Sequence, residues 1–444
     1  MKMMKYCSLP VVLMAMLLAA CSDSDDEPVV PDPDEPDKKI TNLDDEYYDW
    51  EVADSRQVVD GVKYTCYSFT RFSERVHVVE VDLNDPKLTV EVSMADDLAP
   101  NPNANDRHNN GPCLRETLRE NIQRKRSEGR NIVAGINTGF FDSHVGIPRG
   151  IHVEKGEMVY LNNPDVRNRL GNHVWGIAFF NDRSVAFDER KAEGHVRVAG
   201  KEYEFFSVND TVVALRGKVK YDANVYTHRL VAQPHPGIYN EVSPDALFIV
   251  AKGNGCITVN TGYQEAVVTD IIDGRNTDVE VPYVDNKGEW VLQVTGSKAD
   301  MIASSLKKGD KIEIETVVKI GEKTAPLDAY NAGMFYYVRN GEYVAPPQSY
   351  AETIYQTMNV GTDASGKRLF LFCIDGVRNY RGLDFYEASR VAKKLGVADV
   401  VRFDGGGSTT MWVLDDKGGD VVNNITDSKG ERSCMNYLHI RRLD

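Results

Sequence analysis

Hydrophobic and polar residues alternate over short stretches in the first part of the chain. Between residues 47 and 92, the segments YTCYSF and RVHVVEVDL are short, alternating and rich in β-branched residues, which predicts β-strands. From Cys113 to Gly129 apolar residues instead recur every four positions, and Gly129 lies just past the last of them. This spacing predicts an amphipathic helix. The next segment, NIVAGIN at 131–137, is almost wholly apolar and predicts a buried strand.

The last hundred residues predict two strands with a helix between them. KRLFLFCID ends in Asp375, LDFYEASRVAKKLG is amphipathic and stops at Gly396, and ADVVRFD ends in Asp404. Strand, helix and strand in succession predict a βαβ unit, whose two strands would be parallel neighbours. Asp375 and Asp404 would then lie at the same edge of the sheet, where open α/β sheets bind their ligands.

The region between these segments, residues 174–338, predicts a series of short strands and turns without a clear repeat. Taken together, the patterns predict a fold of the α+β or α/β class. We expect a mixed β-sheet flanked by helices that contains the C-terminal βαβ unit, with a smaller β-rich N-terminal region that holds one helix.

The N-terminus has the features of a targeting segment. Lys2 and Lys5 precede an apolar run at 11–20, and the sequence LAAC ends in Cys21. This arrangement resembles a bacterial lipobox, so we expect Cys21 to carry lipid; cleavage of an ordinary signal peptide near residue 20 is the alternative. The following stretch, SDSDDEPVVPDPDEPDKK, is acidic and rich in Pro, which predicts a disordered tether.

Composition and charge exclude some classes of function. Of the 444 residues, 42% are hydrophobic and 27% are charged, as in an ordinary globular protein. The net charge of −15 argues against a nucleic-acid partner, because neutralising phosphates needs clustered Lys and Arg. Beyond the N-terminus no apolar run is long enough to span a membrane, so we expect the lipid to be the only membrane contact.

The spacing of cysteines and histidines does not indicate a disulfide framework or a transition-metal site. Five of the seven cysteines remain after Cys7 and Cys21, and they are widely spaced without a CxxC motif. The nine histidines form no HxxxH or HExxH cluster. We therefore expect no catalytic metal and no required cofactor, while a structural Ca²⁺ bound by scattered Asp and carbonyl oxygens stays open.

The segment RFDGGGSTTMWV, at 402–413, places three consecutive glycines directly after Asp404. A nucleotide-binding phosphate loop is excluded, because no Lys follows the glycines and the next residues predict a strand. A nucleophile elbow is disfavoured, since Thr410 replaces the final Gly of that motif. Two interpretations remain. The segment is either a plain turn, or a tight loop whose backbone N–H groups approach an anion beside an acid.

The same segment resembles the signature of the phosphodiester glycosidase family. Further stretches resemble that family in the same order, over about residues 132–440: AGINTGFFD, AGMFYYVRNGEYV, QTMNVGTDASGKRLFLFCIDGVR, GLDFYEASRVAKKLG and GERSCMNYLHI. The departures are Thr138, the run at 358–360 and an inserted Val377, which bear on specificity more than on reaction class. The predicted organisation is a signal peptide at 1–20, a tether at 21–45, a β-rich region with one helix at 46–130 and a phosphodiester glycosidase-like domain at 131–444.

Two carboxyl groups usually catalyse hydrolysis at a sugar's anomeric carbon, one as acid and one as base or nucleophile. Asp375 and Asp404 are the first pair, because both end predicted strands at one sheet edge; a turn-forming role is the alternative for each. The resemblance adds Glu387. Since Glu387 lies three residues after Asp384, a capping box of the predicted helix is an equal alternative.

Substrate-binding residues are expected around the glycine loop. A guanidinium matches phosphate in a bidentate way, so arginines are candidates for phosphate binding. Asn137 ends a buried strand, where its amide could bind sugar hydroxyls, and the resemblance adds the closing Glu-Arg pair. The candidates are Asn137, Arg149, Arg378, Gly405, Gly406, Gly407, Ser408, Thr409, Glu431 and Arg432.

The resemblance implies a hydrolase that cleaves the glycosidic bond of a sugar-1-phosphodiester in a cell-envelope or extracellular glycan. Its partners would be a phosphorylated glycan and, through the lipid on Cys21, a membrane of the cell envelope. A non-catalytic surface module that binds phosphorylated glycans is the alternative, followed by a bare structural domain. Carboxylates at both Asp375 and Asp404 favour the enzyme, because a binding module does not need the pair.

Overall fold

The computed structural model describes most of the chain from Asp45 to Leu443. These residues fall in one compact unit, Ile40–Asp444. Cys21 and the rest of the predicted signal peptide and tether up to residue 44 lie outside the described residues, as do Cys113 and Arg378. The described residues are 45–95, 114–142, 147–162, 175–209, 223–229, 246–275, 277, 279, 282, 284, 286–346, 353–376 and 379–443.

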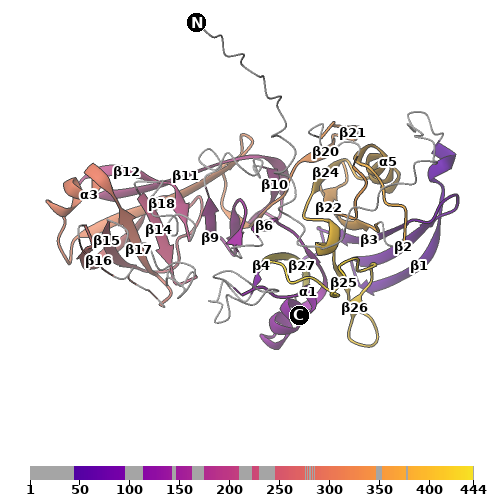
Figure 1. Ribbon diagram of the computed structural model, residues 1–444, viewed down its shortest axis with the longest axis horizontal. Coiled ribbons are helices and arrows are strands. Elements are labelled where there is room, and N and C mark those ends of the chain that lie inside the picture. The colour runs from indigo at the N-terminus through magenta and orange to yellow at the C-terminus, as the bar shows by residue number, and fades with distance from the viewer. Residues whose placement is uncertain are drawn as a thin grey trace, which may run out of the picture. The chain divides into compact units, whose positions relative to one another are not determined.

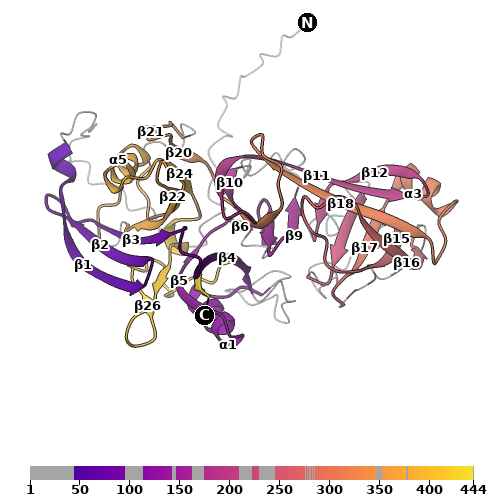
Figure 2. The ribbon, with the colours of Figure 1, turned by 180° about the vertical axis from the view of Figure 1, so that it is seen from behind.

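Two antiparallel sheets pack against each other and hold the C-terminal strands (Figures 1 and 2). The first has eight strands in the order β1-β2-β3-β23-β22-β24-β20-β21. Their bounds are Trp50–Val59, Val62–Phe69, Arg75–Asp82, Arg368–Ile374, Thr357–Thr362, Asp399–Arg402, Tyr336–Arg339 and Glu342–Tyr343. The second sheet has five strands in the order β26-β25-β5-β27-β4. Their bounds are Asp420–Val421, Met411–Val413, Asn131–Asn137, Asn436–Arg442 and Leu88–Met94.

Strands from distant parts of the sequence alternate in both sheets. β3 pairs with β23, and β4 pairs with β27, so strands of the predicted N-terminal region lie beside strands of the predicted glycosidase-like domain. One apolar core lies between the sheets and takes residues from both, among them Val79, Leu371 and Val401 from the first and Ile136 and Leu438 from the second.

One helix covers the outer face of each sheet (Figure 1). α5 (Phe385–Leu395) packs Ala388, Val391 and neighbouring residues against β23 and β24. It begins at a capping box formed by Asp384 and Glu387 and ends at Gly396, whose φ of 79° is left-handed. α1 (Leu118–Ser127) begins at the capping box of Thr117 and Glu120 and covers the five-stranded sheet.

A third sheet closes on itself. Its twelve strands follow the order β10-β19-β8-β9-β13-β14-β17-β15-β16-β18-β11-β12, and β10 also pairs with β11. Apolar side chains from many of its strands form one core cluster. α3 (Gly296–Ala303) packs against this core, and β6 (Phe141–Asp142) pairs with β7 (Ile147–Pro148) apart from it. The strand bounds, in sheet order, are Trp175–Phe180, Leu327–Ala332, His152–Glu154, Glu157–Asn162, Ser207–Val208, Ala223–Thr227, Glu289–Val294, Leu247–Gly253, Gln264–Asp273, Lys311–Ile320, Val185–Val198 and Lys201–Phe205.

The predicted fold class is wrong. The described residues form mostly β-sheet with three α-helices, and not a mixed sheet flanked by helices. The βαβ prediction failed for a definite reason: β23 and β24 do run parallel, but β22 lies between them and is antiparallel to both. The strand–helix–strand succession does not exclude a third strand between the two, and the apolar run of β23 has a separate cause. The apolar run arises because this antiparallel sheet is buried on both faces, by the core between the two sheets and by α5.

Candidate active site

The two predicted catalytic aspartates flank the start of β22. Asp375 directly follows β23, and Asp404 follows β24 by two residues. Gln356, just before β22, lies between them: a Cβ on Gly376 would come within 2.5 Å of the Gln356 Cβ, and one on Gly405 within 2.5 Å of the Gln356 carbonyl oxygen. Since β22 separates the two strands, their ends lie about 10 Å apart, or two strand spacings. The aspartates therefore share one sheet edge.

Asn137 holds the glycine loop at both ends. Its Nδ2 donates to the Asp404 carbonyl oxygen at 2.9 Å, and its Oδ1 accepts from the Thr410 N–H at 2.9 Å. The Asp404 N–H in turn donates to the Thr138 carbonyl oxygen at 2.8 Å. Asn137 thus lies beside the loop, and its amide group is occupied by backbone groups rather than free for sugar hydroxyls. Because Asn137 is the last residue of β5, it connects both ends of the glycine loop to this strand.

The Asp404 carboxyl is buried among positive charges. It is 8% exposed, and burial raises its pKa to about 6. A hydrogen bond with the Ser408 side chain acts in the opposite direction. So do the charges of Arg432, Arg402 and Arg149, in that order. A carboxyl with this pKa can hold a proton near neutral pH, and the arginines can attract an anion to the same place.

Each glycine of the triplet has its own reason to lack a side chain. A Cβ on Gly405 would meet the Gln356 carbonyl oxygen. Gly406 has a φ of +57°, which L-residues rarely adopt, and the space beside it is open. A Cβ on Gly407 would come within 2.5 Å of the Arg432 guanidinium. The triplet therefore permits close packing on two sides and leaves its middle residue facing free space.

The backbone of this loop is mostly satisfied within the protein. The Gly406 N–H donates to the Gln356 carbonyl oxygen at 2.8 Å. The N–H groups of Ser408 and Thr409 donate to the carbonyl oxygens of Gly405 and Gly406. An anion cradle made of consecutive N–H groups would need these bonds to break, so side chains are better placed to bind an anion here.

The predicted arginines differ in how they are held. Arg432 donates from Nε to Asp427 at 2.6 Å, and its Nη1 lies 3.5 Å from the Ser408 hydroxyl. The Nε of Arg149 is buried and has no hydrogen-bond partner among the described residues. Thr409 Oγ1 is likewise buried without a partner within the described part of the chain. Arg149 and Thr409 each have a buried hydrogen-bonding atom that no described residue uses.

Asp375 belongs to a buried relay that the sequence did not reveal. Its Oδ2 lies 3.1 Å from His77 Nε2, and its Oδ1 accepts from the Asn424 N–H at 3.0 Å. His77 Nδ1 lies 2.8 Å from the Tyr64 hydroxyl. Burial is the largest single effect and lowers the pKa of His77, but the hydrogen bonds and charges of Asp375 and Cys66 together outweigh it and raise the pKa to about 9. His77 and Asp375 therefore form a buried ion pair at neutral pH.

Glu387 and Glu431 have clear structural partners. Glu387 forms the predicted capping box with Asp384, and Arg381 donates to its two oxygens at 2.8 and 3.1 Å. Glu431 accepts from the N–H of Arg119, in the first turn of α1, at 2.8 Å. The local role of Glu387 is present in the structure, and its catalytic role stays a prediction.

Arg402 is a further charged residue that the sequence analysis did not single out. It is 4% exposed, and its guanidinium lies 5.1–5.7 Å from the ring centroids of Phe140, Phe335, Tyr355 and Phe385. Such ring faces stabilise a cation. The only sequence signal was one Arg within the apolar run VVRF. His77 gave an equally weak signal in the alternating strand RVHVVEVDL.

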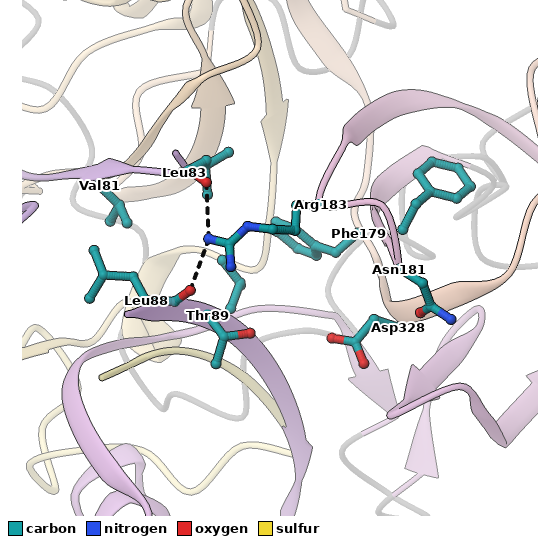
Figure 3. Close-up of a pocket in the computed structure, with 10 residues that line it drawn as sticks. Val81, Leu83, Leu88, Thr89, Phe179, Asn181, Arg183 and Asp328 are labelled. Carbon is teal, nitrogen blue, oxygen red and sulfur yellow. Dashed lines mark hydrogen bonds between the residues drawn. The ribbon is translucent and has the colours of Figure 1, made fainter. Parts of the chain in front are cut away.

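A cavity of about 220 Å³ lies elsewhere, between β3, β4 and β10 (Figure 3). Arg183 crosses it and donates to the carbonyl oxygens of Leu83 and Leu88 at 3.0 Å. None of the predicted site residues lines it. Its lining residues are Val81, Leu83, Leu88, Thr89, Val90, Phe179, Phe180, Asn181, Arg183 and Asp328.

Comparison with known proteins supports the sequence resemblance. Residues 254–441 match the family model described as Phosphodiester glycosidase. The resemblance to this family is confirmed. The matched segment contains Asp375, Asp404, the glycine triplet and Arg432, and leaves Asn137 and Arg149 outside. A glycosidase-type function is therefore supported at the level of the family. No curated protein matches the chain.

Solved structures share the fold at low sequence identity. A Synechocystis protein superposes with a TM-score of 0.59 at 15% identity, covering 88% of this chain and 64% of that one. The present chain thus spans less than two thirds of that protein. A Burkholderia pseudomallei protein gives a TM-score of 0.55 at 15% identity, with 84% and 74% covered. The zebrafish N-acetylglucosamine-1-phosphodiester α-N-acetylglucosaminidase catalytic domain gives only 0.32 at 15% identity, with 88% and 82% covered, and carries no structural argument.

Proposed function

We propose that the protein hydrolyses the glycosidic bond of a sugar-1-phosphodiester in a cell-envelope or extracellular glycan. The observation that carries this proposal is the Asp404 carboxyl, with a pKa of about 6, next to Arg149, Arg402 and Arg432. Asp404 and its glycine loop fall within the segment that matches the phosphodiester glycosidase family. A protonatable carboxyl among cations suits a substrate in which an anionic phosphate adjoins the bond to be broken.

The geometry supports a separate role for each group. Arg149 and Arg432 bind the phosphate, and Arg149 offers an unused Nε for it. Asp404 donates its proton to the phosphate oxygen as the bond from that oxygen to the anomeric carbon breaks. A bound phosphate raises the pKa of Asp404 further by charge repulsion, which keeps the acid protonated until it is used. Water supplies the hydroxyl group at the anomeric carbon, so the products are a free sugar and a phosphomonoester.

Asp375 is the second carboxylate in this scheme. Its Oδ2 lies 3.1 Å from His77 Nε2, a contact that orients the carboxyl group for the role of base or nucleophile. The same pairing also favours the alternative function, a non-catalytic module that binds phosphorylated glycans. Both Asp375 oxygens already have partners, His77 and the Asn424 N–H, so the carboxylate is held by the protein.

Product analysis in ¹⁸O-labelled water tests the proposal. The purified chain is incubated with a panel of glycosyl-1-phosphodiesters, and products are separated by mass spectrometry. Cleavage at the anomeric carbon places ¹⁸O in the sugar. Label in the phosphate would show a phosphodiesterase and overturn the proposal. Tight binding of the panel without any turnover would establish the binding module instead.

The cellular location is part of the same proposal. We propose that Cys21 carries lipid and that the acidic stretch after it tethers the body to the cell envelope, on the strength of the leader sequence. Among the described residues, the structure contains no helix that is long and apolar enough to cross a membrane.

A further inference from the structure

We propose that Glu157, His228 and Cys256 bind a divalent cation of the zinc type at the closed twelve-stranded sheet. One ligand atom from each, a carboxylate oxygen, an imidazole nitrogen and the thiol sulfur, lies within 4.8 Å of the other two. The site is independent of the candidate active site and of the function proposed for it.

The sheet itself brings these residues together. Glu157 is the first residue of β9, His228 directly follows β14, and Cys256 lies three residues beyond the end of β15. The Met158 N–H donates to the Ile257 carbonyl oxygen at 2.9 Å, so the neighbours of Glu157 and Cys256 are joined through their backbones. The three side chains are therefore held by strand ends of one rigid sheet. Their wide separation in the sequence is why spacing motifs did not reveal them.

Glu157 has a buried oxygen that points to a ligand. The residue is 5% exposed. Its Oε2 accepts from Arg229, 3.3 Å from Nε and 3.1 Å from Nη2. Its Oε1 makes no hydrogen bond of normal geometry within the described residues, although the Cys256 thiol is near enough to interact with it. Glu157 Oε1 also lies 3.9 Å from His228 Nε2. A buried carboxylate oxygen without a partner is costly, and a cation bound between these groups would satisfy it.

The donor set and the local charge both fit a zinc-type ion. Thiolate, imidazole and carboxylate are its preferred ligands, and three protein ligands leave a fourth position for water. Glu157, Glu154 and an ionised Cys256 supply three negative charges against one on Arg229, whose Nη2 lies 3.7 Å from Glu154. This excess of negative charge favours a cation at the site. The positive charge of Lys287 also reaches His228 and Cys256 and moderates this excess.

Binding requires only a modest movement of side chains. Metal–ligand bonds of about 2.0–2.3 Å place tetrahedral ligands about 3.3–3.6 Å apart. Because the three atoms lie within 4.8 Å of one another, they must approach by up to about 1.5 Å. The competing explanation is that Glu157 serves only as the partner of Arg229, in which case the sheet binds no ion.

The test is a titration of the full chain with Co²⁺ and then with Zn²⁺. Co²⁺ bound to a thiolate gives a charge-transfer absorption band, which separates this site from weak binding to the acidic tether. We expect one equivalent of Co²⁺ to produce the band and Zn²⁺ to displace it. Cys256→Ser should abolish the band. Loss of a residue that only contacts a metal ligand weakens metal binding by about 10- to 100-fold. Because Glu157 and His228 would bind the metal directly, Glu157→Gln and His228→Gln should each weaken binding by a larger factor.

His195→Gln is the matched control, since His195 lies in the same sheet with a carboxylate of Glu193 at 3.5 Å. It should bind as wild type does. Absence of the thiolate band in the wild-type chain, or a band that survives Cys256→Ser, would overturn the proposal. Circular dichroism checks folding of each variant. Should Glu157→Gln unfold, the decision rests on Cys256→Ser, which alters a side chain beyond the end of β15 and keeps its size.

Discussion

Replacing Asp404 by Asn separates a catalytic carboxyl from a turn-forming one. The amide keeps the shape and can still accept the hydrogen bond from Ser408, but it has no proton of suitable acidity to donate. General acid catalysis contributes about 10²- to 10⁴-fold, so we expect kcat to fall by that factor with KM nearly unchanged. This loss corresponds to about 3–5 kcal/mol of transition-state stabilisation.

The same substitution should stabilise the protein at neutral pH. Burial raises the pKa of Asp404 from 3.8 to about 6, so the folded state holds the proton more tightly than the unfolded state does. The free-energy cost of burying the ionised Asp404 carboxylate is absent below pH 3.8, grows as the pH rises toward 6 and is complete above pH 6. It amounts to about 3 kcal/mol at pH 7. Asp404→Asn removes this cost, so its Tm should exceed that of the wild type at pH 7.5 and converge with it near pH 4.

Steady-state kinetics on a glycosyl-1-phosphodiester and thermal unfolding at the two pH values measure both effects. Asp399→Asn is the matched control, because Asp399 begins the same strand, β24, and accepts the Asn340 N–H at 3.1 Å. It should leave turnover unchanged. Wild-type turnover in Asp404→Asn would refute the acid role. Loss of activity together with a lower Tm at pH 7.5 would show that the carboxylate is needed for the fold.

Three further predictions follow from individual contacts. Gly407→Ala places a Cβ 2.5 Å from the Arg432 guanidinium and should raise KM for a phosphodiester by about 10- to 100-fold with the fold retained; an unchanged KM would exclude Arg432 from binding. His77 has its pKa raised from 6.5 to about 9 mainly by Asp375, so it stabilises the fold below pH 6.5 and this contribution is lost as the pH rises through 9. In urea unfolding, the free energy of unfolding of the wild type should therefore decline between pH 7 and 10, and His77→Gln should reduce this decline. An identical decline in both proteins would contradict the ion pair. Cys21→Ala should move the protein from the membrane fraction to the soluble fraction, whereas a soluble wild-type protein would rule out the lipid anchor.

Local patterns were sufficient to predict individual elements. The strand at Asn131–Asn137 has the expected bounds, and α5 ends at Leu395, directly before the Gly396 that predicted its stop. The first helix begins at Leu118 rather than near Cys113, because the capping box of Thr117 starts it there. These features depend on residues within one or two turns of each other, so the sequence displays them directly.

Strand pairing could not be predicted in this way. β22 lies upstream of both β23 and β24 in the chain and still inserts between them. Neither the apolar run of β23 nor the helix after it distinguishes a parallel neighbour from an antiparallel one. The choice depends on which distant strands satisfy the backbone hydrogen bonds and cover both faces, and that is a property of the whole fold.

In the candidate site, too, local features could be predicted from the sequence and contacts between distant segments could not. The sequence by itself determined that Asp404 precedes a loop of three glycines and that Asp375 ends a buried strand. Only the tertiary structure decided why each glycine is required, because the Gln356 carbonyl and the Arg432 guanidinium come from other segments. It also brought His77 to Asp375 across nearly 300 positions of the chain. Charges and packing contacts act through space, so their partners emerge only once the sheets have assembled.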